Sequence, residues 1–204
     1  MDKSEKKLNQ EVIYEGRVIN LTKDEVLCPN GNTSLREIVH HRGGVGILFK
    51  INDKFVLEKQ YRYAFNEEMI EIPAGKLEEG EIPLPAAERE MLEETGYRPL
   101  EMVFLGDMYP TVGYSNEVIH LYYCDKAIKE ERHLDNDECI DLFTLSLEEI
   151  EQLIYENKIK DSKTIAALYL SLPSRVYADF TVDNEYGFDT EETAARLDRI
   201  AAAE

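Results

Sequence analysis

The order of strand and helix signals along the chain limits most strongly the folds that are open to it. Strand-like segments fill much of residues 12–75 and 101–145, whereas helical patterns are confined to residues 85–95, 146–158 and 161–172. Strands and helices therefore do not alternate as they do in a doubly wound parallel sheet. The sequence predicts an α+β fold with few helices, the first of which is expected to begin at Pro85.

Three segments of different character divide the chain. The turn signal PNGN at residues 29–32 separates two strand patterns, which predicts an antiparallel N-terminal β region over residues 1–42. A pair of glycines then marks a break, and residues 43–172 are expected to form the main domain. Residues 173–204 are an extension whose role the pattern does not define.

Composition excludes several classes of partner. The formal net charge of −19 should repel nucleic acids and anionic membranes, which proteins bind mainly through Lys and Arg. The three cysteines are far apart and form no zinc-binding pattern, and no apolar run approaches membrane-spanning length. We therefore expect a cytoplasmic protein that binds neither nucleic acid nor membrane.

Three glutamates crowd one face of the helix expected at residues 85–95. Glu90, Glu93 and Glu94 stand at helical spacings that bring like charges together, at a cost of a few tenths of a kcal/mol per pair. A solvated acidic face is one explanation. However, no basic residue follows Arg89 until Arg98, and a glycine-containing loop precedes the helix. Carboxylates beside such a loop are typical of a Mg²⁺ site, because Mg²⁺ takes oxygen ligands and leaves positions for substrate phosphates.

The spacing of these residues resembles a known motif. Its fixed positions are two glycines, four acidic residues, one arginine and two bulky apolar residues, here Gly75, Glu81, Arg89, Glu90, Met91, Glu93, Glu94, Gly96 and Tyr97. They resemble the full Nudix box. Over residues 10–172 the chain is similar to the ADP-ribose pyrophosphatase branch of that family. The resemblance implies an α/β/α sandwich with a mixed sheet, and a homodimer that exchanges its N-terminal β region.

The resemblance also implies a metal site and a catalytic group. Glu90, Glu94 and the backbone carbonyl of Ala74 would bind Mg²⁺, with Mn²⁺ as the alternative. Catalytic roles fall to Glu93, beside the metal, and to Arg89, which would orient the glutamates. The general base would be Glu138, with Asp137 as second choice; the other explanation for those two acids is a solvated turn.

Four residues are implied in substrate binding. Arg62 resembles the arginine that meets the substrate phosphates, and Arg36 and Glu37 resemble strand residues that reach the substrate across the dimer. A surface salt bridge is the alternative for these last two. Gly113 belongs to a substrate loop in which related enzymes carry Ser-Pro-Gly and this chain carries Thr-Val-Gly, with Val112 in place of the proline.

The function implied is metal-dependent hydrolysis of ADP-ribose to AMP and ribose 5-phosphate. The valine at position 112 weakens the assignment of this substrate, so another nucleoside diphosphate derivative, such as the nucleotide-sugar GDP-mannose, is the alternative. A nucleotide sensor without catalysis is a further hypothesis, although every box carboxylate is present. An acidic scaffold protein is the last.

Overall fold

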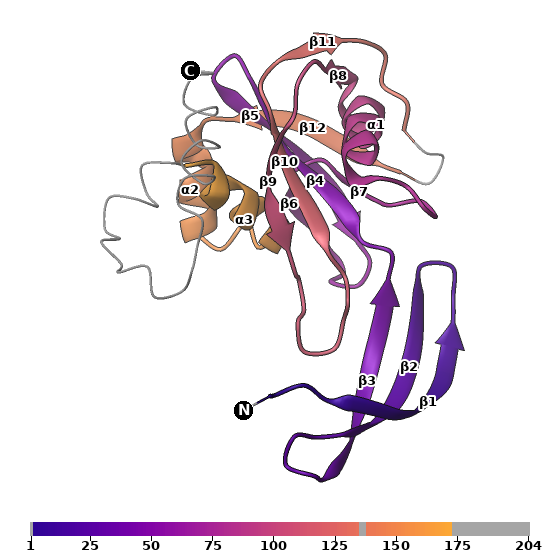
Figure 1. The fold of residues 1–204 in the computed structure, drawn as a ribbon. Helices are drawn as coiled ribbons and strands as arrows, with labels where there is room; N and C mark the ends of the chain where they lie inside the picture. Colours follow the sequence, from indigo (N-terminus) through magenta and orange to yellow (C-terminus); the bar gives the residue numbers. More distant parts are fainter. Residues whose placement is uncertain (1, 135–137, 173–204) are drawn as a thin grey trace.

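A mixed β-sheet between two layers of helix forms the body of the protein, and a smaller sheet extends from it (Figure 1). The computed structural model describes residues 2–134 and 138–172. In chain order, the elements are β1 (Lys6–Glu15), β2 (Ile19–Leu27), β3 (Thr33–His41), β4 (Gly44–Ile51), β5 (Lys54–Arg62), β6 (Glu67–Glu71), β7 (Ala74–Lys76), α1 (Pro83–Thr95), β8 (Tyr97–Pro99), β9 (Val103–Met108), β10 (Ile119–Cys124), β11 (Ala127–Lys129), β12 (Ile140–Leu145), α2 (Leu147–Tyr155) and α3 (Ser162–Ser171).

The central sheet combines parallel and antiparallel pairs. Its order is β12-β5-β4-β10-β9, with β6 paired to β5 and β7 paired to β4. Strands β4 and β10 run parallel, whereas β4 and β5 run antiparallel. Helix α1 lies on one face of this sheet, and α2 and α3 lie on the other (Figure 1). The predicted α+β class and the helix-sheet-helix layering are confirmed.

The alternation of side chains along β4 explains why helices are needed on both faces. Val45, Ile47 and Phe49 pack with α1, whereas Leu48 packs with α2 and α3. Successive strand residues point to opposite faces, so a strand that is apolar from Val45 to Phe49 must be covered on both sides. The two apolar clusters that result form the core.

Helix α1 begins earlier than the sequence indicated. Pro83, and not Pro85, occupies the first helical position, so the expected start was wrong by two residues. Both prolines fit within the first turn, where backbone N–H groups lack a helical partner in any case. The other end is as expected: Gly96 adopts φ 72° and its N–H donates to the carbonyl of Leu92 at 2.8 Å.

The helices near the end of the described chain are capped as their sequences indicate. The Ser146 hydroxyl accepts from the N–H of Glu149, whose carboxylate accepts in turn from the N–H of Ser146 at 2.7 Å. The Asp161 carboxylate accepts from the N–H of Thr164 at 2.9 Å and starts α3. Both expected helices are present, but α2 ends at Tyr155, three residues before the expected end at 158, whereas α3 matches the expected 161–172 closely.

The N-terminal region is an antiparallel sheet of its own, in the order β1-β2-β3. Its β2–β3 turn has Gly31 at φ 85°, and the N–H of Cys28 donates to the carbonyl of Asn32 at 2.8 Å. The predicted antiparallel arrangement is confirmed. The extension at 173–204 lies outside the described residues. In the described chain, no helix is both long and apolar enough to cross a membrane, and the three cysteines are free thiols.

We expect Met91→Ala to lower the free energy of unfolding by about 2–4 kcal/mol, because it leaves a cavity between α1 and the sheet. Met91 is fully buried among Val45, Ile47 and their neighbours. Urea unfolding monitored by circular dichroism measures the loss. The control is Tyr63→Ala, at a side chain that is 88% exposed, which should change the value by less than about 0.5 kcal/mol. Equal effects of the two substitutions would contradict this packing.

Candidate metal and catalytic site

The backbone of β7 meets two carboxylates of α1. The N–H of Ala74 donates to Oε2 of Glu94 at 2.8 Å. A Cβ atom built at Gly75 would lie 1.9 Å from Cδ of Glu90, so any side chain at position 75 would displace that carboxylate. The glycine therefore lets the loop and the helix approach each other. Ala74, Glu90 and Glu94, the three metal-binding residues predicted from the sequence, are brought together.

Arg89 joins the other acids of the motif. Its guanidinium donates to both carboxylate oxygens of Glu81 at 2.9 Å, and its Nη1 donates to Glu90 and Glu93 at 2.9 Å each. These bonds lower the pKa of Glu81 and raise that of Arg89. Arg89 thus fixes the loop to the helix and partly offsets the repulsion between neighbouring glutamates. The catalytic roles of Arg89 and Glu93 remain predictions.

The two principal carboxylates are buried. Glu94 is 2% exposed and Glu90 is 8% exposed. Burial raises the pKa of both, because a charged carboxylate loses hydration, and the negative charge of Glu58 raises the pKa of Glu94 further. Arg89 only partly counteracts this effect at Glu90. Without a cation, the charged form of these two carboxylates is therefore disfavoured relative to water.

Sequence reasoning missed a second group of buried charges, behind the first. Glu58 on β5 is fully buried, and Glu71 on β6, its cross-strand partner, is 3% exposed. Burial alone would raise the pKa of Glu71, but the Arg62 hydrogen bonds and the Lys163 charge outweigh it, so the pKa is lowered. The signal that could have found Glu58 is the strand period, which places it on the same face as the apolar Val56.

Arg62 lies in that second group. Its guanidinium donates to Oε1 and Oε2 of Glu71 at 2.6 and 2.8 Å, and Lys163 of α3 contacts the same carboxylate. The side chain of Arg62 is 36% exposed, so part of it faces solvent. Binding of substrate phosphates by Arg62 remains a prediction, and this ion pair is its present contact.

Glu138, predicted as the general base, stands in the described chain just before β12. It follows residues 135–137, which are not described, so Asp137 lies outside the described residues. The charge of Glu138 is one of the smaller causes that raise the pKa of Glu58, Glu90 and Glu94. Its role as base remains a prediction.

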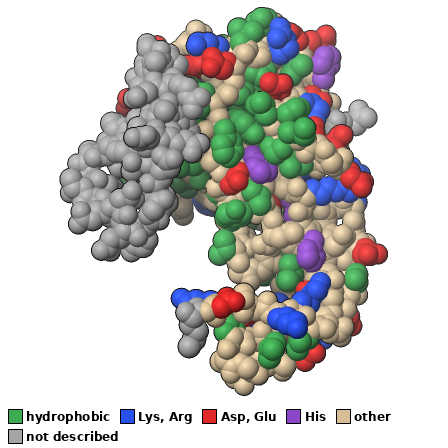
Figure 2. All heavy atoms as spheres, in the orientation of Figure 1, with side chains coloured by type: hydrophobic (Ala, Val, Ile, Leu, Met, Phe, Trp, Pro, Cys, Tyr) green, Lys and Arg blue, Asp and Glu red, His purple; other side chains and the backbone are tan. Residues whose placement is uncertain are grey.

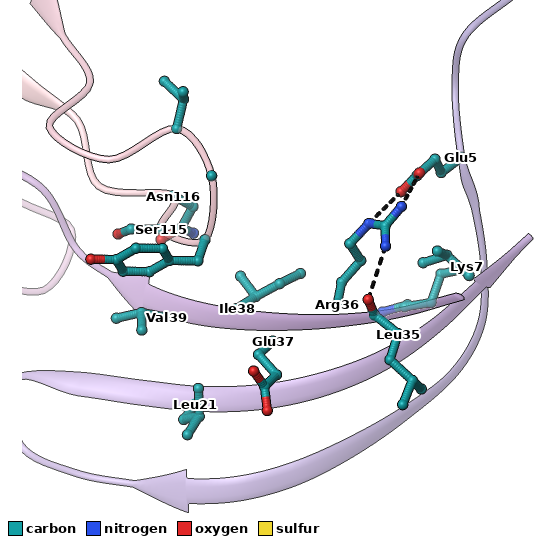
Figure 3. Close-up of a pocket in the computed structure, with 14 residues that line it drawn as sticks. Glu5, Lys7, Leu21, Leu35, Arg36, Glu37, Ile38, Val39, Ser115 and Asn116 are labelled. Carbon is teal, nitrogen blue, oxygen red and sulfur yellow. Dashed lines mark hydrogen bonds and ion pairs between the residues drawn. The ribbon is translucent and has the colours of Figure 1, made fainter. Parts of the chain in front are cut away.

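A pocket of about 920 Å³ lies between the N-terminal sheet and the β9–β10 loop. Arg36 and Glu37 of β3 line it, together with Val112 and Gly113 of that loop. Figure 3 shows Arg36 turned toward Glu5, to which its Nε donates at 2.9 Å, while Glu37 extends from the opposite side of the strand. Three of the four residues predicted to bind the substrate, Arg36, Glu37 and Gly113, therefore line this pocket, whose lining includes none of the glutamates of α1. Arg62, the fourth, does not line it.

The donor atoms fit a hard divalent cation. Glu90, Glu94 and a backbone carbonyl are oxygen donors, and oxygen-only sites suit Mg²⁺ or Mn²⁺. Across residues 2–134 and 138–172, no group of three acidic, His or Cys side chains is arranged to hold a metal ion by itself, so water and substrate would complete the coordination. The test of fit is the buried negative charge, because a cation would remove the cost that burial imposes on Glu94.

We expect Glu94→Gln to stabilise the EDTA-treated protein, and more so at high pH. The folded pKa of Glu94 lies above its ordinary value of 4.5. The folded state therefore holds this proton more tightly than the unfolded chain does. As a result, the stability of the wild-type protein is highest below pH 4.5 with respect to this group and falls as pH rises through the folded pKa. Calorimetry between about pH 5.5 and about pH 8.5 should show a gain in Tm that grows with pH. The control Glu88→Gln, at an exposed position of α1, should show no such growth; a constant or falling gain for Glu94→Gln would contradict the account.

Comparisons with known proteins show the family to which the chain is similar. The model of the NUDIX domain matches residues 40–168. A methanol dehydrogenase activator of Bacillus methanolicus is 45% identical over 172 residues, covering 82% of this chain and 93% of that protein. An ADP-ribose pyrophosphatase of Bacillus subtilis (strain 168) is 36% identical over 178 residues, covering 85% and 96%.

The fold is found again in a solved structure. A crystal structure of an ADP compounds hydrolase matches with a TM-score of 0.74 at 20% identity, covering 82% of this chain and 92% of that one. The matched family domain spans the loop, the helix and the acids that meet at the site. The chain belongs to the Nudix family.

Proposed function

We propose that this protein hydrolyses the diphosphate bond of ADP-ribose, giving AMP and ribose 5-phosphate. The observation that carries the proposal is the buried pair Glu90 and Glu94, held against the backbone of Ala74 and Gly75. The similarity to an ADP-ribose pyrophosphatase over 96% of that protein's length supports the choice of substrate.

The residues of the site would have three different roles. Ala74, Glu90 and Glu94 would hold Mg²⁺ or Mn²⁺, which when bound neutralises phosphate oxygens and lowers the pKa of water. Arg89 keeps the carboxylates in register through its bonds to Glu81, Glu90 and Glu93. Glu138 would take the proton of the attacking water as general base.

Substrate binding would use residues of β3, β5 and the β9–β10 loop, all outside the box. Arg36, Glu37 and Gly113 would bind the nucleotide part, and Arg62 would meet the phosphates. On the face seen in Figure 2, Lys and Arg side chains lie in small groups beside acidic ones, so this face has no extended basic surface that could bind nucleic acid. We also propose a cytoplasmic location, which the free cysteines of the described chain support.

The protein would act as a homodimer in which residues 1–42 reach across to the partner copy. Every residue of β1 is exposed, including the apolar Val12, Ile13 and Tyr14. Exposed apolar side chains on a sheet that extends from the body indicate a surface that another protein chain covers. A second copy would cover them and bring one chain's Arg36 toward the other chain's metal site.

We expect sedimentation to give about twice the chain mass of 23.5 kDa. Ile13→Asp should shift the protein toward monomer, because a charge in an apolar interface is left without a partner. Tyr63→Asp, at an exposed residue of the body, should leave the mass unchanged. A monomeric wild-type protein would contradict the dimer.

Two other functions have specific support. Val112 is 83% exposed at the loop where the sequence departs from the ADP-ribose pattern, so a nucleotide-sugar such as GDP-mannose is the alternative substrate. The similarity to a methanol dehydrogenase activator makes activation of a dehydrogenase the second candidate. Turnover of a sugar nucleotide without turnover of ADP-ribose would favour the first, and an increase in methanol dehydrogenase activity would favour the second.

We expect Glu94→Gln to reduce kcat for ADP-ribose by at least about 100-fold, because the variant loses a charged metal donor. Phosphate release, after a phosphatase acts on the AMP formed, measures turnover. EDTA should abolish wild-type activity, and Mg²⁺ should restore it. Glu88→Gln, on the exposed side of the same helix, should keep wild-type activity. Activity that survives both EDTA and Glu94→Gln would refute a metal-dependent hydrolase.

A further inference from the structure

One buried acid, Glu58, has no place in the site described above. Its side chain is fully buried, and neither carboxylate oxygen has a hydrogen-bond partner in the described part of the chain. A buried polar group without a partner costs about 1–3 kcal/mol, and a charged one costs more. A core position on β5 would be filled more stably by an apolar residue. The presence of a glutamate there requires an explanation.

The position of Glu58 in the sheet points it toward the acids of α1. Val56, two residues earlier on the same strand, packs in the cluster that α1 covers, and strand periodicity places Glu58 on that face. Strand β5 pairs with β4 only as far as Val56, which lies opposite Phe49. Beyond that point the neighbour of β4 is β7, with Ala74 opposite Gly46. Glu58 therefore lies where the Ala74 segment enters the sheet.

The cations near Glu58 bond to another acid. Arg62 and Lys163 both contact Glu71, the cross-strand partner of Glu58. Arg89, on the far side, bonds to Glu81, Glu90 and Glu93. Within the described residues, none of these ion pairs includes Glu58 or Glu94. The buried layer between β5 and α1 therefore contains two carboxylates that no cationic side chain of those residues contacts in an ion pair.

Electrostatics agrees with this placement. Burial and then the charge of Glu58 are the largest causes that raise the pKa of Glu94. Burial also raises the pKa of Glu58, and the positive charge of Lys163 only partly counteracts it. A cation bound at Glu94 would lie within the field of both carboxylates.

We propose that Glu58 is an additional acidic residue of the metal site, placed behind Glu94, which strengthens the binding of a divalent cation without being one of its predicted ligands. It does so by adding negative charge on the sheet side and by accepting a hydrogen bond from a cation-bound water. The inference rests on the proposed function, because that function supplies the metal.

The experiment compares Glu58→Gln and Glu58→Met with wild-type protein. Thermal unfolding is measured after EDTA treatment and then across a Mg²⁺ titration, because a ligand that binds the folded state raises Tm according to its affinity. Both variants remove an unpartnered buried carboxylate and should raise the metal-free Tm. Both should also weaken Mg²⁺ binding by about tenfold, the size of effect found when a group that supports a metal ligand is lost.

Two controls separate the possible outcomes. Asp24→Asn removes a buried carboxylate from the N-terminal sheet and should leave Mg²⁺ affinity unchanged. Glu94→Gln should abolish the Mg²⁺-induced rise in Tm. If Mg²⁺ does not stabilise the wild-type protein, the proposed function fails.

If Mg²⁺ stabilises wild type and both Glu58 variants equally, only the role of Glu58 fails. A Glu58 variant that does not fold, or whose metal-free Tm falls, would also overturn the proposal, since the carboxylate would then have a structural partner.

Discussion

The close contact between the β7 backbone and the carboxylates of α1 determines how the loop, the sheet and the helix must fit together. Gly75 leaves room for Glu90, and the N–H of Ala74 holds Glu94. The contact forms only if β7 enters the sheet beside β4 and if α1 packs flat on the same sheet. The apolar packing of Met91 and the left-handed turn at Gly96 both serve that geometry.

The same contact creates an electrostatic problem. Carboxylates that would be charged in water are buried next to one another, and Arg89 compensates only those nearest the loop. The fold tolerates this cost because the large apolar clusters on both faces of the sheet supply stability elsewhere. Stability is given up at the site, where a cation and a diphosphate can recover it.

Much of this arrangement could be predicted from the sequence because it depends on local spacing. The contacts among Glu81, Arg89 and Glu93 follow from one loop and one helix, as does the Ser146 capping box. The start of α1 was misplaced because two prolines suit a first turn equally. Glu58 and the Arg62–Glu71–Lys163 group depend on strand pairing and on a helix 92 residues away from Glu71, which local spacing cannot specify. Glu37 and Gly113 were identified by resemblance, and their shared pocket became visible only when the β9–β10 loop was placed beside β3.

We propose that the buried acids of α1 and the Ala74 backbone form one metal site. Anomalous diffraction from a crystal soaked with Mn²⁺ and a non-hydrolysable ADP-ribose analogue would locate the cation. We expect a manganese peak within coordinating distance of Glu90, Glu94 and the carbonyl of Ala74, with the diphosphate on its open side. A peak elsewhere in the protein, or a bound analogue with no metal at these residues, would contradict it.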